Sequence, residues 1–231
     1  MIELFKPIIF IYDQIVSVLL ATLQFFANLT GDYGLAIILL TIAVRVIILP
    51  LTIKQTKSMQ EMKRLQPKIK ELQEKYKKDK QKLQQEIMKF YGEHKVNPLA
   101  GCLPLLLQLP IMFALFRVLL ELGKGEKEGF LFFINDISVS AGEAWTKLGT
   151  IEMAPYVVLV LLMIVTTYIP SRMMSTDPQQ DKMMLFMSLF MAYIGWNLPA
   201  GVLLYLVVSN IWTIGQQYVT LRGTEAVAQG G

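Results

Sequence analysis

Long apolar stretches separated by short polar ones dominate this chain, and they predict an all-α membrane protein. Five stretches are long and apolar enough to cross a bilayer as helices. These predicted spans are residues 33–53, 99–120, 153–170, 183–198 and 199–221. The connecting segments are then residues 1–32, 54–98, 121–152, 171–182 and a tail at 222–231. The Pro-Ala-Gly at 199–201 turns the fourth span directly into the fifth.

Residues 1–32 have a two-faced pattern that differs from the five spans. Their polar and small positions recur at three- and four-residue steps, at Gln14, Ser17, Ala21, Gln24 and Asn28. The large apolar residues mostly take the other side, at Ile8, Ile11, Ile15, Leu19, Phe26 and Leu29. A sixth span is the alternative, but this pattern favours an amphipathic helix in the outer membrane interface. No export signal precedes it, so we expect the natural chain to begin further upstream.

Residues 54–98 are predicted to form a cytoplasmic helical hairpin. Apolar positions step by three or four from Met59 to Tyr76 and again from Leu83 to Tyr91, on either side of a polar break at 77–81. Lys54 to Lys95 hold 13 of the 22 Lys and Arg residues but only 6 of the 18 Asp and Glu. Because basic loops stay on the cytoplasmic side, the five spans place the N-terminus outside and the C-terminus in the cytoplasm.

Composition narrows the function classes. The basic charge is local to one loop and indicates no direct nucleic-acid specificity. A single cysteine, Cys102, and a single histidine, His94, provide neither a disulfide nor a metal cluster, so we expect no cofactor. Hydrophobic residues make up 54% of the chain, which identifies a multi-pass membrane protein as the expected class; the family resemblance given below implies the bacterial cytoplasmic (inner) membrane.

Polar residues inside the predicted spans concentrate in their cytoplasmic halves. They are Thr41, Arg45, Gln108, Thr166, Thr167, Ser188, Ser209, Asn210, Thr213, Gln216 and Gln217. Hydrogen bonding between helices would explain single residues of this kind. The one-sided distribution instead favours a hydrophilic groove that opens to the cytoplasm and is closed on the outside. Arg117 is an exception, since it lies one turn from Glu121 and can extend outward.

Arg45 is the residue in this pattern whose burial in the membrane costs the most free energy. It lies about 18 Å along the first span, near the middle of the membrane. Burial of an arginine there costs at least about 2.5 kcal/mol, and its guanidinium does not lose its proton. None of the five spans contains Asp or Glu. We therefore expect Arg45 to receive an anionic group from the cytoplasm, the alternative being a structural arginine capped by backbone carbonyls.

At these residues the sequence resembles the YidC family of membrane protein insertases. The matching stretches include Val44-Arg45, Leu65-Gln66-Pro67-Lys68-Ile69, residues 95–102 (Lys-Val-Asn-Pro-Leu-Ala-Gly-Cys), residues 177–180 (Asp-Pro-Gln-Gln) and Val207-Val208-Ser209-Asn210. The resemblance implies five spans around a cytoplasm-open groove. It places the groove arginine at Arg45 and other groove residues at Thr41, Gln108, Thr213 and Gln217. It also implies that substrate helices leave near Met163 and Tyr205.

The function expected from these features is a non-enzymatic insertase and chaperone for nascent membrane proteins. The predicted groove consists of Arg45, Thr41, Gln108, Ser209, Asn210, Thr213, Gln216 and Gln217. The hairpin either only fixes topology or docks a ribosome, a Sec translocon or anionic lipid. Its candidate docking residues are Lys63, Arg64, Lys68, Lys75, Lys77 and Lys78. A transporter or channel with Arg45 as an anion site is the main alternative, and an intramembrane hydrolase lacks a base for its serines.

Overall fold

The computed structural model describes residues 2–94, 96, 103–122, 129–130, 133–174 and 178–229. Residues 97–102, which carry part of the family resemblance and include Cys102, lie outside this description. So do residues 123–128 of the predicted outer loop and residues 175–177. Eight helices form the described part. They are α1 (Ile2–Thr30), α2 (Tyr33–Lys75), α3 (Lys80–Glu93), α4 (Leu103–Leu122), α5 (Ala141–Lys147), α6 (Thr150–Met174), α7 (Pro178–Trp196) and α8 (Ala200–Gln229).

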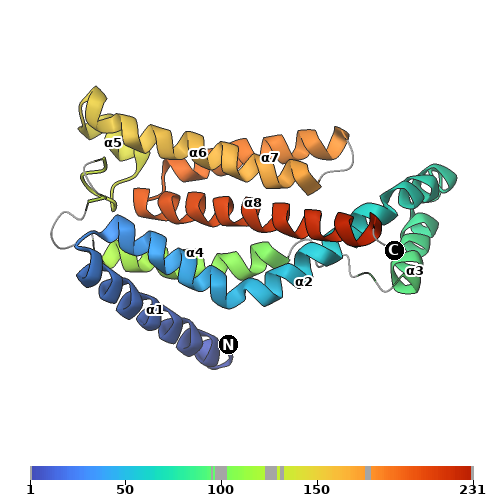
Figure 1. The fold of residues 1–231 in the computed structure, drawn as a ribbon, viewed down its shortest axis with the longest axis horizontal. Coiled ribbons are helices and arrows are strands. Elements are labelled where there is room, and N and C mark those ends of the chain that lie inside the picture. The colour runs from blue at the N-terminus through green and yellow to red at the C-terminus, as the bar shows by residue number, and fades with distance from the viewer. Residues whose placement is uncertain are drawn as a thin grey trace.

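The long helices lie in layers around α8 (Figure 1). α8 packs against α2 on one side and against α6 on the other, and α7 covers α6. α1 packs on α2 and α4 at the opposite edge and runs obliquely to the other helices. The bundle has two distinct ends. We call them the α5 end and the hairpin end, the latter being where α2 and α3 project beyond the other helices.

Helix α2 is one unbroken rod of 43 residues. Gly31 ends α1 with a φ of 69°, and the Asp32 carboxylate then caps α2 by accepting a 2.7 Å hydrogen bond from the Leu35 amide. At 1.5 Å per residue, α2 is about 65 Å long, roughly twice the thickness of a hydrocarbon core. The predicted boundary at residue 53 is therefore no break in structure, because the first span and the first arm of the hairpin form one helix.

The hairpin reverses at residues 76–79, next to the predicted polar break. Asp79 caps α3 through a 3.0 Å bond from the Lys82 amide. Lys75 and Lys82 both lie over the Tyr76 ring, with their Nζ atoms 5.4 and 5.5 Å from its centroid. The turn thus combines a helix cap with cation–π contacts, both local in sequence.

The α5 end is closed by backbone contacts and apolar packing. The amides of Ala200 and Gly201 donate to the carbonyls of Val139 and Ile137, both at 2.9 Å. The Tyr156 hydroxyl donates to the Asp136 carbonyl at 2.9 Å, and Ile137 is buried. Residues 134–140 therefore pack across the first turn of α8.

Length and composition identify three helices able to cross a membrane among the described residues, fewer than the five predicted spans. They are Phe10–Thr30, Tyr33–Lys75 and Thr150–Met173; the described parts of α4 and α7 contribute shorter apolar helices, Gln108–Leu119 and Lys182–Trp196. Helix α8 is neither among the three long apolar helices nor among the shorter ones, because polar residues between Ser209 and Gln217 interrupt its apolar sequence. The count of five spans stays a prediction.

Helix α1 has three faces where the sequence predicted two. One face is buried in the bundle through Val16, Leu19, Leu23 and Ala27. A second is exposed and apolar, with Ile11, Val18, Phe25 and Leu29. The third is exposed and polar, with Gln14, Ser17, Gln24 and Asn28. Ile15, Leu19 and Phe26, which the pattern placed toward lipid, instead pack on the protein core.

Candidate functional site

Arg45 and Ser209 meet at the centre of the contact between α2 and α8. The Arg45 Nε donates to the Ser209 hydroxyl oxygen at 2.9 Å, and its Nη2 donates to the same oxygen. Arg45 is half-buried and Ser209 is fully buried. Within the described residues no carboxylate pairs with this guanidinium, and its Nη1 has no bonding partner there.

A second polar contact joins the same two helices closer to the hairpin end. The Gln216 side-chain Nε2 lies 2.9 Å from the Thr52 hydroxyl and donates to it. Both pairs, Arg45–Ser209 and Thr52–Gln216, are 164 residues apart in sequence. A constant offset means that α2 and α8 run parallel and in register over this length.

The two contacts are one heptad apart, which is the spacing at which parallel packed helices repeat. One heptad nearer the α5 end, the same register places Ile38 opposite Val202. We call these three layers the α2–α8 seam: Ile38 with Val202, Arg45 with Ser209, and Thr52 with Gln216. Seven residues correspond to about 10.5 Å. Along the seam the chemistry changes from apolar, to charged, to neutral polar.

Tyr205 and Gln108 belong to the surroundings of Arg45. The Tyr205 hydroxyl lies close to the side chains of Ser209 and Gln108 and to the Arg45 charge. Gln108 is on α4, so three helices contribute to this cluster. The structure thus brings together Arg45, Gln108 and Ser209 of the predicted groove, and it adds Tyr205.

Other predicted groove residues face elsewhere. The Asn210 amide donates to the Thr167 hydroxyl at 3.0 Å and ties α8 to α6. Thr41 is completely buried, and its hydroxyl donates to the Ile37 carbonyl at 2.6 Å within its own helix. The Thr213 hydroxyl likewise donates to the Ser209 carbonyl at 2.9 Å. Thr41 and Thr213 therefore have satisfied hydroxyls, and Asn210 joins two helices.

The predicted exit residues are inside the protein. Met163 and Tyr205 each expose only 3% of their surface. Met163 packs against the close approach of α7, where a Cβ added at Gly195 would lie 2.9 Å from the Met163 sulfur. Neither residue presents a surface to lipid in this conformation, so their role in substrate exit stays a prediction.

The sequence analysis missed a run of buried neutral residues on α2. Beyond Arg45, the buried polar positions of α2 are Thr52, Gln55, Thr56 and Gln60. They recur mostly at three- and four-residue steps, and the last three lie in the segment predicted to form the cytoplasmic hairpin. The signal was present in the sequence as an uncharged stripe among lysines, but hydropathy averages over both faces of a helix and hides it.

Arg117 has a carboxylate partner on α1 that the sequence analysis did not identify. Its Nη1 lies 2.8 Å from the Asp13 carboxylate on α1, with both side chains about half exposed. The expectation that Arg117 extends outward beside Glu121 overlooked a carboxylate from another helix. The side chain of Glu121 is outside the description.

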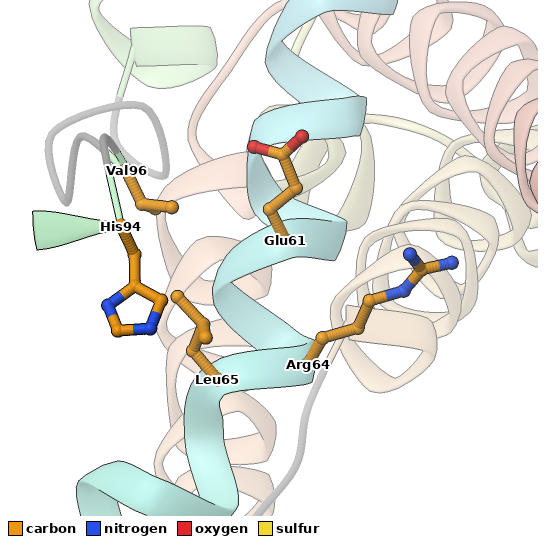
Figure 2. Close-up of a pocket in the computed structure, with 5 residues that line it drawn as sticks. All are labelled: Glu61, Arg64, Leu65, His94 and Val96. Carbon is orange, nitrogen blue, oxygen red and sulfur yellow. The ribbon is translucent and has the colours of Figure 1, made fainter.

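Some of the predicted docking residues contact other parts of the protein, and the others are exposed to solvent. The Lys63 ammonium donates to the Met173 carbonyl at 2.9 Å, which caps the end of α6. Arg64 borders an open pocket of 360 Å³ together with Glu61, Leu65, His94 and Val96. Figure 2 shows His94, Leu65 and Val96 on one side of this pocket and the Arg64 guanidinium pointing away from them. Lys68, Lys75, Lys77 and Lys78 are exposed.

These features define a class: a helical, multi-pass membrane protein with a cation held by neutral groups between its spans. Comparison with known proteins gives the family. A family model described as 60Kd inner membrane protein matches residues 25–227. The chain belongs to this family.

Individual relatives agree with that assignment. The membrane protein insertase YidC of Caldanaerobacter subterraneus subsp. tengcongensis is 42% identical over 89% of this chain and 93% of its own length. The insertase YidC of Geotalea daltonii is 40% identical over 89% of this chain, which spans only 37% of that relative. A crystal structure of an active YidC insertase superposes with a TM-score of 0.73 at 31% identity, covering 90% of this chain and 46% of that one.

Proposed function

We propose that this chain is a membrane protein insertase that receives polar segments of nascent membrane proteins at Arg45. One observation carries the proposal: Arg45 is half-buried, and among the described residues its bonded partner is a neutral hydroxyl and its Nη1 makes no hydrogen bond. Family membership gives independent support, because relatives named as insertases match nearly the whole chain.

A substrate carboxylate would bind Arg45 in competition with Ser209. Hydrogen bonds between two charged groups are stronger than those to a neutral hydroxyl, and a carboxylate can accept from two guanidinium nitrogens at once. The Ser209 hydroxyl therefore keeps the charge partly satisfied while no substrate is present. An acidic flank of a nascent protein replaces it when the segment enters.

The membrane arrangement of the proposal has five spans, with the N-terminus outside and the hairpin in the cytoplasm. The distribution of buried groups supports a groove that opens at the hairpin end. Buried polar side chains cluster from Arg45 toward that end, whereas Ile37, Leu119, Val202 and Leu203 fill the bundle toward the α5 end with apolar atoms. A polar segment can then enter only part of the way across.

Insertion in this scheme needs no chemical reaction. A polar pocket that reaches the middle of the membrane shortens the apolar distance that a translocated segment must cross. The following apolar helix of the substrate then moves into lipid, and its hydrophobic burial provides the driving force. The exposed lysines of the hairpin provide the surface for a ribosome, a Sec translocon or anionic lipid.

The test is insertion of a small protein with an acidic translocated tail into vesicles that contain this chain. Arg45→Ala is expected to lower insertion at least about tenfold, since a buried charge-assisted bond is worth about 1.5–3 kcal/mol. Arg45→Lys should retain part of it, because the charge remains without the bidentate geometry. Protease protection of the tail measures the yield.

Arg117→Ala is the matched control, because it removes the other arginine that lies within a predicted span. Insertion should stay near the wild-type level in this variant. Equal loss in both variants would mean that Arg45 acts only through stability. Normal insertion by Arg45→Ala would overturn the receptor role.

A further inference from the structure

Trp145 is an exposed aromatic residue on α5, the short helix of the predicted outer loop. Ser140 and Glu143 cap this helix reciprocally: the Glu143 amide donates to the Ser140 hydroxyl at 3.2 Å, and the Ser140 amide donates to the Glu143 carboxylate at 3.3 Å. α5 also packs against α6 and α7. The helix is thus held in place, yet 59% of the Trp145 surface is exposed.

The three sides of α5 differ in chemistry. Ala141 and Ala144 are fully buried and form the side that faces the protein. Glu143 and Lys147 are four residues apart and form an exposed ion pair at 3.6 Å. Trp145 is two residues from each of them, so it lies on the opposite side of the helix from their charges. α5 is therefore a small amphipathic helix with an exposed apolar side and an exposed charged side.

Trp145 belongs to an aromatic cluster at the end of α7. The ring centroids of Trp145 and Trp196 are 6.0 Å apart, with 55° between the ring planes. Gly142 permits this approach, because a Cβ added there would lie 3.0 Å from the Trp196 Nε1. Tyr193, about one turn before Trp196, exposes 72% of its surface. Trp and Tyr concentrate at the two membrane–water interfaces of multi-pass proteins.

Helix α6 locates the edge of the bilayer near this cluster. The first charged residues from its two ends are Glu152 and Arg172, and both are exposed. They are 20 positions apart, which corresponds to about 30 Å, the thickness of a hydrocarbon core. Between them runs an exposed apolar stripe with Val158, Leu162 and Val165. Glu152 therefore marks the bilayer edge at the α5 end.

The end of α7 lies on the bilayer side of this edge. A Cβ added at Gly195 would lie 2.9 Å from the Met163 sulfur. Met163 is 11 positions from Glu152, or about 16 Å, and its side chain extends back over roughly one turn of α6. Trp196, next to Gly195, and the Trp145 ring beside it therefore lie level with the last apolar turns of the span.

We propose that α5 is a lipid anchor, with Trp145 inserted where the headgroups meet the acyl chains and the pair of Glu143 and Lys147 facing water. Amphipathic helices lie in this zone with their apolar side in lipid. Lipid is the occupant, because the exposed Trp145 surface lies beside the apolar stripe of α6 and the exposed Tyr193 of α7. The inference goes beyond the proposed function and requires only that the bundle spans a bilayer. It moves α5 out of the aqueous part of the predicted outer loop.

Fluorescence quenching in phosphatidylcholine vesicles measures the depth of Trp145. Trp196→Phe with Trp212→Phe leaves it as the only tryptophan of the chain. The comparison variant adds Trp145→Phe and Lys147→Trp, which puts the only indole on the charged side of the same helix. Three quenchers report three depths: iodide on both sides of the vesicle, bromine on the acyl chains near the glycerol, and bromine near their methyl ends.

We expect Trp145 to be quenched most by bromine near the glycerol and little by iodide, and the comparison variant to be quenched most by iodide. Strong quenching of Trp145 by iodide would place it in water and overturn the anchor. Strongest quenching by bromine at the methyl ends would place it in the bilayer centre, which also contradicts the proposal. Weak quenching by all three would mean that a second protein copy covers the ring, and lipid would be the wrong occupant.

Cysteine labelling tests the same assignment with the native Trp196 in place. Trp145→Cys and Lys147→Cys are each made with Cys102→Ser, which removes the only native cysteine. A water-soluble maleimide should label Trp145→Cys at least about tenfold more slowly, because an apolar environment disfavours the reactive thiolate. Labelling of both variants after denaturation in detergent corrects for intrinsic reactivity. Equal rates in vesicles would refute the anchor.

These outcomes are independent of insertase activity. A chain that inserts no substrate, but shows the expected depth of Trp145, disproves the proposed function and leaves the anchor intact. A chain that inserts substrates normally while Trp145 is in water disproves only the anchor.

Discussion

Arg45 and Ser209 face each other across the contact between α2 and α8, and one hydroxyl accepts two hydrogen bonds from the guanidinium. This relationship explains how the chain tolerates a cation between predicted spans that contain no acidic residue. It also indicates a structural role for Ser209, as hydrogen-bond acceptor for Arg45, that the pattern of polar residues in the sequence does not reveal. In the proposed function, Ser209 holds the arginine in place until a substrate carboxylate replaces it.

Ser209→Ala should therefore separate stability from insertion. Loss of the shared acceptor is expected to lower the free energy of unfolding by about 1.5–3 kcal/mol, the range for hydrogen bonds to charged groups. Insertion of acidic-tailed substrates should persist, because the carboxylate no longer competes with the hydroxyl. Unfolding in mixed detergent micelles and the vesicle assay measure the two quantities. An insertion loss as large as that of Arg45→Ala would show that Ser209 itself binds substrate.

The three faces of α1 predict its position in the membrane. If α1 lies in the interface, Gln24→Cys should react with a water-soluble maleimide, and the neighbouring Phe25→Cys should be protected by lipid. Both positions are exposed on the protein itself, so the protein does not shield either of them. Labelling of intact vesicles, again with Cys102→Ser, gives the rates. Protection of both positions would favour a sixth span, which the length and composition of Phe10–Thr30 also permit.

The pair of Asp13 and Arg117 is expected to contribute little to stability. Both side chains are about half exposed, and exposed ion pairs are worth about 0–1 kcal/mol. A double-mutant cycle with Asp13→Asn and Arg117→Gln should give a coupling energy in that range. A coupling well above it would indicate that lipid or protein excludes water from the pair.

Substitutions of two lysines of the hairpin should differ in their effects on stability and on binding. Lys63→Gln is expected to lower stability by about 0.3–1 kcal/mol, because Lys63 places a positive charge at the C-terminal end of α6. Lys77→Gln should leave stability unchanged and weaken binding to ribosomes or to anionic vesicles, since Lys77 is exposed at the turn. Binding measured by sedimentation and unfolding measured on both variants test whether Lys63 acts in stability and Lys77 in binding. Equal binding by wild type and Lys77→Gln would argue that this charge only fixes topology.

Tyr91 gives the hairpin a pH dependence at the alkaline end. Burial raises the pKa of its phenol, because it disfavours the charged phenolate. The folded hairpin therefore holds this proton more tightly than the unfolded chain does. Its stabilising effect is complete below the ordinary tyrosine pKa of about 10 and is lost as pH rises through the higher folded value. Tyrosinate absorbance of wild type minus Tyr91→Phe should show a component that titrates late; its absence would contradict the burial.

The sequence by itself determined the helical class and the basic hairpin, and it predicted the depth of Arg45. These features follow from local chemistry: apolar length, three- and four-residue periodicity, and the excess of lysine in one loop. It also identified Ser209 and Gln216 as polar positions facing inward. It could not pair them with Arg45 and Thr52, because each pairing joins residues 164 positions apart.

The tertiary structure decided which helix faces meet. In a chain of this kind, lipid and protein interior are both apolar, so hydropathy does not distinguish a lipid-facing side from a packed one. Met163 and Tyr205, which the family resemblance places near the substrate exit, are buried, and so is Gln55 on α2. The rotation and register of α2 against α8 depend on packing between distant segments. That packing converts a set of polar residues into a seam with distinct layers.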